Sequence, residues 1–178
     1  SNRSVDIFYG EALDVFEHLK ASFDIHSIFS VRESGTKSTW QRDKNVTSFC
    51  RANQIIWEES QRDGILRGIK NRKDWNKQWH IAMHKPVIKN EYSISKEKTL
   101  IHPFTLPEKL EAQLKDYPKH YQPAGEQNAW RYLKSFANQR GFNYQRHISK
   151  PNESRVSCSR ISPYLAWGNM SIKQAFQF

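Results

Sequence analysis

Three serines, Ser157, Ser159 and Ser162, crowd together in the chain, and Pro163 follows them. Proline suits the first turn of a helix, because its fixed φ is helical and its missing N–H is not needed there. The first N–H groups of a helix lack partners inside the helix, so they and nearby hydroxyls can bind an anion. The spacing therefore predicts a phosphate-type site before a helix that starts near Ser162. A serine at that position can also be an ordinary N-cap, and this alternative stays open.

Other side chains that carry chemistry are sparse. Cys50 and Cys158 are far apart and match no metal-ligand spacing, so we expect two reduced thiols, with no disulfide and no metal site. Trp75 and Trp79 are four residues apart, a spacing that suits stacking on nucleobases but more often marks a packed helix face.

Charge is distributed unevenly along the 178 residues, whose net charge is +10. Residues 1–60 hold seven Lys and Arg against nine Asp and Glu, whereas residues 61–120 hold thirteen against seven and residues 121–178 eight against two. A basic half joined to a near-neutral half suggests a polyanion as partner for the second half. No apolar run approaches the roughly 20 residues of a membrane span, and no secretory leader is evident. We expect a cytoplasmic protein without a membrane partner.

The elements that must position these residues differ between the two halves. In residues 1–60 the sequence predicts strands over 5–9, 25–31 and 54–58, which alternate with helices over about 11–19 and 38–52. This order favours a parallel sheet with right-handed crossovers. Three strands are fewer than such a sheet usually has, so we expect the chain to begin inside a domain.

Residues 61–104 have no clean periodicity and carry the basic cluster 67–73, and we expect an interdomain linker there. From 105 onward the signals are helical. Thr105 to Glu108 has the pattern of a capping box at the start of a helix. Residues 126–139 are expected to form an amphipathic helix, with Gly141 at its left-handed C′ position. An irregular stretch is expected after it. Ser162 is expected to cap a short helix that Gly168 closes, and Ser171 to cap another.

Residues 121–178 resemble the FAD-binding region of the photolyase/cryptochrome family. The family pattern is Gly-Glu before an amphipathic helix, then Tyr, Pro, a Thr-Ser-x-Leu-Ser-Pro-like turn and Tyr-Leu-x-x-Gly-x-x-Ser. The corresponding residues are Gly125-Glu126, Leu133, Phe136, Tyr144, Pro151, the run from Cys158 to Gly168, and Ser171. This sequence departs from the pattern in having Cys158 at the usual Thr position, Ile148 where the family has a basic residue, and two extra residues after Pro151.

The earlier part of the chain fits the same family. Gly10 before a helix, and Arg42-Asp43 followed by Val46, look like the second half of the family's α/β antenna domain. The resemblance thus implies a partial Rossmann-like α/β domain over 1–60, a linker over 61–104 and the start of an all-α FAD-binding domain over 105–178.

The resemblance implies a function as well. Members of the family bind FAD, and the photolyases among them use blue light to split pyrimidine dimers in DNA, a lyase reaction. The residues expected to contact FAD are Tyr144, Ser157, Cys158, Ser159, Arg160, Ile161 and Ser162, while Arg146 and His147 are candidates for contact with damaged DNA. An antenna chromophore of undetermined identity is also implied. The longer protein is expected to be a monomer.

The family places its electron-transfer tryptophans and lesion pocket downstream, so we expect no catalytic residue among these 178. A chain that carries only part of the cofactor site is expected to purify without FAD and to be inactive alone. Two alternatives remain open: a cryptochrome that senses light without repair, and a nucleotide- or nucleic-acid-binding module without photochemistry.

Overall fold

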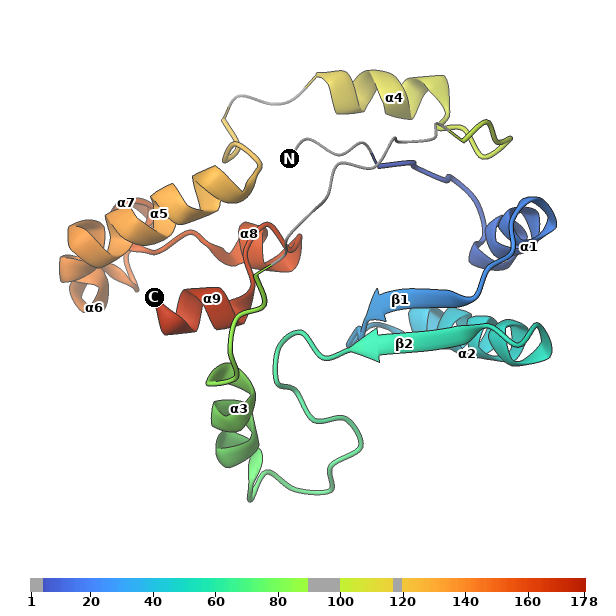
Figure 1. Cartoon of the computed structure of the whole chain (residues 1–178). Helices are drawn as coiled ribbons and strands as arrows, with labels where there is room; N and C mark the ends of the chain where they lie inside the picture. Colours follow the sequence, from blue (N-terminus) through green and yellow to red (C-terminus); the bar gives the residue numbers. More distant parts are fainter. Residues whose placement is uncertain (1–4, 90–99, 117–119) are drawn as a thin grey trace. The chain divides into compact units, whose positions relative to one another are not determined.

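The computed structural model describes residues 5–89, 100–116 and 120–178 (Figure 1). It is a mixed α/β structure with a two-stranded parallel sheet near the N-terminus and a mostly helical remainder. The chain forms two compact units, one of residues 1–61 with 89–117 and one of residues 62–88 with 118–178. We call them unit 1 and unit 2.

Unit 1 contains the sheet. Strands β1 (Ser27–Val31) and β2 (Ile56–Ser60) pair in parallel, with Ser27 opposite Ile56 and Val31 opposite Ser60. The parallel arrangement predicted from the sequence is confirmed for these two strands. β1 begins two residues later than expected and ends where expected, and β2 lies two residues further along the chain. Helices α1 (Ala12–Ser22) and α2 (Lys37–Ala52) pack against them around a small core. Its buried residues are Val46, Cys50 and Ile55.

The expected strand over residues 5–9 is wrong. This segment has no regular secondary structure and joins neither described strand. Instead, the N–H of Tyr9 donates to the carbonyl of Phe104 at 3.0 Å, and the ring of Phe8 stacks on His102 with centroids 4.2 Å apart. The β-branched and aromatic composition of the segment is thus used for packing against a later segment of the same unit.

Helix α4 (Glu108–Lys115) completes unit 1, and its start corrects a second expectation. Pro107 occupies the N-cap position and no side chain caps the helix, so the capping box expected from Thr105 to Glu108 does not form. An i,i+4 ion pair of 2.8 Å joins Glu111 to Lys115 on its exposed surface.

In unit 2, the segment expected to be a linker contains a helix, α3 (Trp75–Met83). Met83 is buried, and Trp79 meets Phe176 edge-on with ring centroids 5.1 Å apart. Gln177 then donates to the carbonyl oxygens of Met83 and Lys85, at 2.7 and 2.8 Å. Within unit 2, α3 therefore packs on the last helix of the chain. Residues 90–99 of the expected linker lie outside the described residues.

Helix α5 (Glu126–Asn138) confirms the amphipathic helix expected over 126–139. Ala129 and Leu133 are buried in a core with Tyr164 and Met170. Gly141 is not the left-handed C′ residue we expected, because it lies inside the 3₁₀ helix η1 (Arg140–Asn143). A Cβ at this position would come within 2.8 Å of the carbonyl oxygen of Phe136, so close approach of the backbone requires glycine here.

The stretch after η1 is more regular than expected. The short helices are α6 (Tyr144–His147), α7 (Pro151–Ser157), α8 (Ser162–Ala166) and α9 (Ile172–Gln177). Gly168 has a φ of 71° just after α8, and Ser171 forms a complete capping box with Gln174 at the start of α9. Both of these expectations are confirmed. Among residues 120–178 there is no strand.

In the part of the chain that the structure describes, no helix has the length and apolar character needed to cross a membrane.

Candidate functional site

Six of the seven residues expected to contact FAD lie in one turn of unit 2, residues 157–162, which we call the serine turn. Ser157 ends α7 and is buried, with 4% of its surface exposed. Cys158, Ser159, Arg160 and Ile161 are half-buried, and Ser162 is exposed. The turn thus runs from the protein interior to the surface, where a ligand can reach it.

Arg140, which sequence reasoning did not single out, holds the inner side of the serine turn. Its Nη1 donates to the carbonyl oxygens of Val156 and Cys158 at 2.9 and 2.6 Å, and its Nη2 donates to that of Ser159 at 3.2 Å. The same guanidinium is anchored on α5 through two further acceptors, the carbonyl oxygen of Tyr132 at 2.9 Å and Oγ of Ser135 at 3.0 Å. A guanidinium has five N–H donors in a fixed fork, and this geometry explains why one side chain can bind so many acceptors.

The direction of these carbonyls fixes the direction of the neighbouring N–H groups. A trans peptide unit is planar, and its C=O and N–H point to opposite sides. Because the carbonyls of Cys158 and Ser159 point toward Arg140, the N–H groups of Ser159 and Arg160 must point away from it.

A second side chain, that of Gln122, fixes the orientation of the next peptide unit, between Arg160 and Ile161. Its Nε2 donates to the carbonyl oxygen of Arg160 at 2.7 Å, and its Oε1 accepts from Nε of Arg160 at 3.3 Å. By the same argument, the N–H of Ile161 points away from Gln122. Gln122 too was missed from the sequence, because it is 38 residues from its partner.

The backbone of the turn has a shape suited to anions. Arg160 has a φ of 59°, in the left-handed region, and Ile161 follows at φ −88° and ψ −10°. Alternation of left- and right-handed residues makes a concave nest of successive N–H groups. In the described part of the chain, the backbone N–H groups of residues 159–162 have no hydrogen-bond acceptor. Four free donors on a half-exposed turn are what an oxyanion needs.

The N-cap expectation for Ser162 is wrong. Ile161 occupies the N-cap position of α8, Ser162 is the first helical residue, and no side chain caps this helix. A helix of five residues also has little macrodipole. The features that suit an anion are therefore the nest and its free N–H groups, and they do not depend on the helix.

His147 connects the serine turn to the short helix that carries Tyr144. Its Nδ1 lies 2.7 Å from Oγ of Ser157, and its Nε2 lies 3.0 Å from a carboxylate oxygen of Glu153. Both ring nitrogens thus have partners inside the protein, whereas Arg146 is exposed. Tyr144 packs edge-on against Phe136, with ring centroids 5.9 Å apart. Tyr144 and Ser157, thirteen residues apart in sequence, are thereby held on neighbouring elements.

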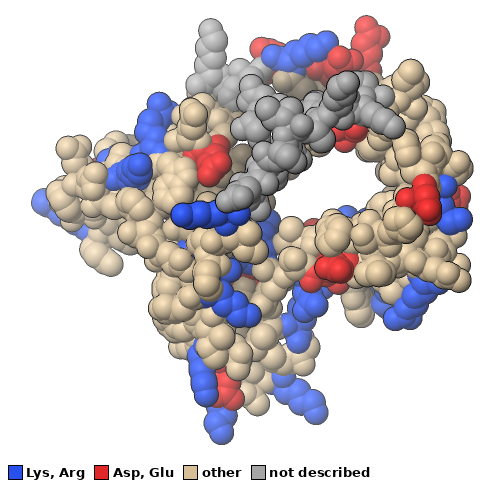
Figure 2. All heavy atoms as spheres, in the orientation of Figure 1, with Lys and Arg blue, Asp and Glu red and all other residues tan. Residues whose placement is uncertain are grey.

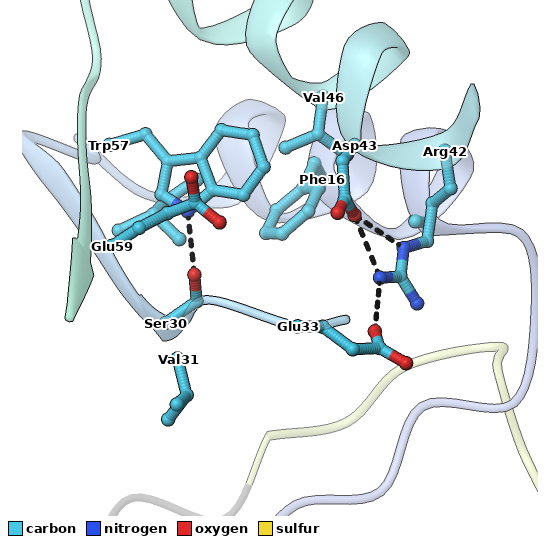
Figure 3. Close-up of a pocket in the computed structure, with 11 residues that line it drawn as sticks. Phe16, Ser30, Val31, Glu33, Arg42, Asp43, Val46, Trp57 and Glu59 are labelled. Atoms are coloured by element: carbon cyan, nitrogen blue, oxygen red, sulfur yellow. Dashed lines mark hydrogen bonds and ion pairs between the residues drawn. The ribbon is translucent and has the colours of Figure 1, made fainter. Parts of the chain in front are cut away.

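Unit 1 has a separate pocket of about 270 Å³ over one face of its two parallel strands, where Ile28 and Ser30 of β1 lie beside Trp57 and Glu59 of β2 (Figure 3). Phe16 of α1, Val46 of α2 and Trp57 of β2 supply apolar walls, and Nε1 of Trp57 donates to Oγ of Ser30 at 2.9 Å. These contacts fix the indole ring as one wall of the pocket.

Charged groups line the rim of this pocket. The guanidinium of Arg42 lies 2.7 Å from a carboxylate oxygen of Asp43 and 2.9 Å from one of Glu33, as Figure 3 shows. The hydrogen bonds that Arg42 donates to Asp43, and then to Glu33, raise the pKa of Arg42. Glu59 adds a third carboxylate, so acceptors dominate the rim. Such a pocket suits a flat aromatic molecule with N–H donors along one edge.

Among the described residues, no group of three or more His, Cys, Asp and Glu is placed to hold a metal ion. Comparison of the chain with models of known protein families, with curated proteins and with solved structures finds no match.

Proposed function

We propose that this chain carries the pyrophosphate-binding turn of an FAD site, in a photolyase-type protein that repairs pyrimidine dimers in DNA under blue light. The observation that carries the proposal is the nest at residues 159–162, whose free N–H groups suit the two phosphates of FAD. The flavin and the reaction come from the family resemblance of residues 121–178. When bound, reduced flavin supplies the light-driven electron transfer that repair requires.

The roles of the individual residues follow from the geometry of the turn. Ser159 offers both its N–H and its hydroxyl at the half-exposed part, and Ser162 offers the same groups at the surface. Arg140 and Gln122 orient the peptides from the opposite side. Tyr144 lies on the element next to the turn and is proposed to face the adenosine side of the cofactor.

Titration of the chain with ADP tests the anion site directly, because ADP contains the pyrophosphate and adenosine of FAD without the flavin. Isothermal calorimetry should show that ADP binds more tightly than AMP, and AMP more tightly than adenosine. In the Ser159→Ala variant the affinity for ADP should fall about tenfold to a hundredfold, the usual effect of losing a hydrogen bond to a charged group.

Ser154→Ala is the matched control, since Ser154 lies on α7 and its Oγ donates to the carbonyl oxygen of Pro151. This variant should bind ADP as the wild type does. If ADP binds no better than adenosine, or if both serine variants weaken it equally, the serine turn is not a pyrophosphate site and the proposal fails.

Repair is tested on the longer protein that the resemblance implies, loaded with reduced FAD and mixed with DNA that contains a thymine dimer. Loss of dimers in blue light but not in the dark supports the proposal. Flavin binding without light-dependent repair would favour the cryptochrome alternative. ADP binding without flavin binding would favour the nucleotide-binding module.

The pocket of unit 1 supports a second part of the proposal, an antenna chromophore. Its aromatic walls and carboxylate-rich rim suit a planar heteroaromatic whose amino group faces Glu59 or Asp43. Pterin is a suitable probe, and its binding should quench tryptophan fluorescence in the wild type. The Trp57→Leu variant should bind pterin at least about tenfold more weakly, whereas unchanged binding would exclude this pocket.

A further inference from the structure

The segment of unit 2 from residue 62 to residue 85 is strongly basic. It has seven Lys and Arg against two Asp. Figure 2 shows this excess of blue over α3 and the loop before it, in the lower part of the view. Among the described residues, none of the seven cations forms an ion pair. Within the part of the chain that the structure describes, no carboxylate neutralises their charge, which is thus available to a polyanion.

A hollow of about 340 Å³ opens beside this segment, between the loop and the exposed side of α3. Its apolar lining consists of Leu66, Ile69 and Trp75, and its polar lining includes Lys70, Asn71 and Gln78. Oδ1 of Asn71 accepts the N–H of Lys73 at 3.0 Å, and this bond orients the amide of Asn71 within the loop. One acidic residue, Asp74, also lines the hollow. Apolar walls with a few amide and charged groups are typical of small-molecule sites.

The two tryptophans of α3 differ in their surroundings. Trp79 contacts Phe176 and lies against Gly64, where an added Cβ would come within 3.0 Å of its ring, so it is part of the packing of unit 2. Trp75 lies one turn earlier, stacked beside Trp79 with centroids 6.4 Å apart, and it lines the hollow. The guanidinium of Arg72 lies over the ring of Trp75, 5.6 Å from its centroid.

We propose that this surface binds single-stranded nucleic acid. One unpaired base enters the hollow and stacks with Trp75 and the guanidinium of Arg72, while Asn71 and Gln78 contact the base edge. The flanking phosphates lie on Lys70, Lys73 and Arg67. Aromatic stacking combined with a basic track is how single strands are bound without strong sequence preference. The hollow distinguishes a single strand from a duplex, because paired bases are not free to enter it. The inference does not depend on FAD, since none of these residues belongs to the serine turn.

The test is fluorescence anisotropy of the chain with fluorescein-labelled oligo-dT over a range of salt concentrations, compared with a duplex of the same length. The single strand should bind more tightly than the duplex. Trp75→Leu should weaken binding roughly fivefold to a hundredfold, the range for loss of one stacked base. Trp75→Phe should keep most of the affinity, because the aromatic ring is retained.

The cations that contact phosphates are tested with the triple variant R67Q/K70Q/K73Q. A plot of log affinity against log salt has a negative slope, and each phosphate contact of a single strand adds roughly 0.7 to its magnitude. Loss of three contacts should therefore lower this magnitude by about 2. The matched control R131Q/K134Q/R155Q removes the same charge from α5 and α7 and should leave the slope nearly unchanged. Circular dichroism checks that each variant is folded.

Three results would overturn the proposal: equal weakening by the two triple variants, equal affinity of Trp75→Leu and wild type, or tighter binding of the duplex. Competition by poly-glutamate as effective as that by oligo-dT would instead show a general polyanion surface and would also overturn it. None of these assays contains flavin or ADP, so the outcome is independent of the test of the serine turn.

Discussion

The guanidinium of Arg140 and the carbonyl oxygen of Cys158 lie 2.6 Å apart, although the two residues are separated by seventeen others in the chain. This contact, with those to the carbonyls of Val156 and Ser159, turns the carbonyls of the serine turn inward and its N–H groups outward. The proposed anion site is thus shaped by a cation on the opposite side of the turn. Arg140 is a positioning residue, and its effect should be measurable without any ligand.

Replacement of Arg140 by lysine is expected to destabilise the chain although the charge is kept. One ammonium cannot reach acceptors on both α5 and the serine turn, so several half-buried carbonyls lose their donor. The free energy of unfolding should fall by at least about 2 kcal/mol, since each hydrogen bond from a charged group contributes about 1.5–3 kcal/mol. Urea unfolding followed by circular dichroism measures this, with Lys134→Met on the exposed side of α5 as the control. Equal stability of Arg140→Lys and wild type would show that the hydrogen bonds of Arg140 between α5 and the serine turn do not stabilise the chain.

Two serines at helix starts are expected to differ in their effect on stability. Oγ of Ser171 accepts the N–H of Gln174 at 3.0 Å in a complete capping box, whereas Ser162 caps nothing. Ser171→Ala should therefore lower the free energy of unfolding by about 1 kcal/mol. Ser162→Ala should change it by less than about 0.5 kcal/mol. The reverse order in urea unfolding would show that Ser162 is a cap after all.

Gly141 is expected to reject any side chain, whatever its backbone preference. An added Cβ would meet the carbonyl oxygen of Phe136 at 2.8 Å, and relief needs a backbone shift that costs about 1–3 kcal/mol. Asparagine tolerates left-handed conformations better than alanine does. If Gly141 were needed for a left-handed φ, Gly141→Asn would be clearly more stable than Gly141→Ala in thermal unfolding. The structure predicts that Asn is no better than Ala.

Cys50 is expected to make stability depend on pH in the alkaline range. Burial raises the pKa of the Cys50 thiol. Below the unfolded pKa of about 8.5 both states are protonated, and the contribution of the buried thiol is fully present. As pH rises further, the unfolded state releases the proton first, so stability falls until the raised folded pKa is passed. Urea unfolding between pH 7 and 10 should show this loss, and Cys50→Ala should show a smaller one.

Thiol labelling gives an independent check of the same feature. Cys158 is half-buried, and Cys50 is 3% exposed. In the native protein at pH 8 a maleimide should therefore label Cys158 first, and in urea both thiols should react. Faster labelling of Cys50 would show that the core of unit 1 opens readily.

Elements whose signals are local can be predicted from the amino-acid sequence alone. Apolar residues at helical spacing predicted α2 and α5, β-branched and aromatic runs predicted β1 and β2 to within two residues, and Ser171 and Gly168 marked their helix ends correctly. Each of these depends on residues within about one helical turn, where propensity and backbone chemistry act directly. The crowding of serines before Pro163 likewise indicated where an anion site should be sought.

The use that the fold makes of these local signals depends on contacts between distant residues. Residues 5–9 have the composition of a β-strand, but the N–H of Tyr9 bonds to Phe104 and not to a strand of the sheet. Strand pairing also requires a neighbouring strand, and tertiary contacts decide which segment lies beside residues 5–9. Serine is a favoured residue at the N-cap of a helix, but Ser162 does not cap α8. Arg140 and Gln122 turn the peptides of the serine turn from seventeen or more residues away, and nothing in the sequence near either marks that role. Hydrogen bonds between distant residues depend on how the chain folds back, and this is why the nest was found only in three dimensions.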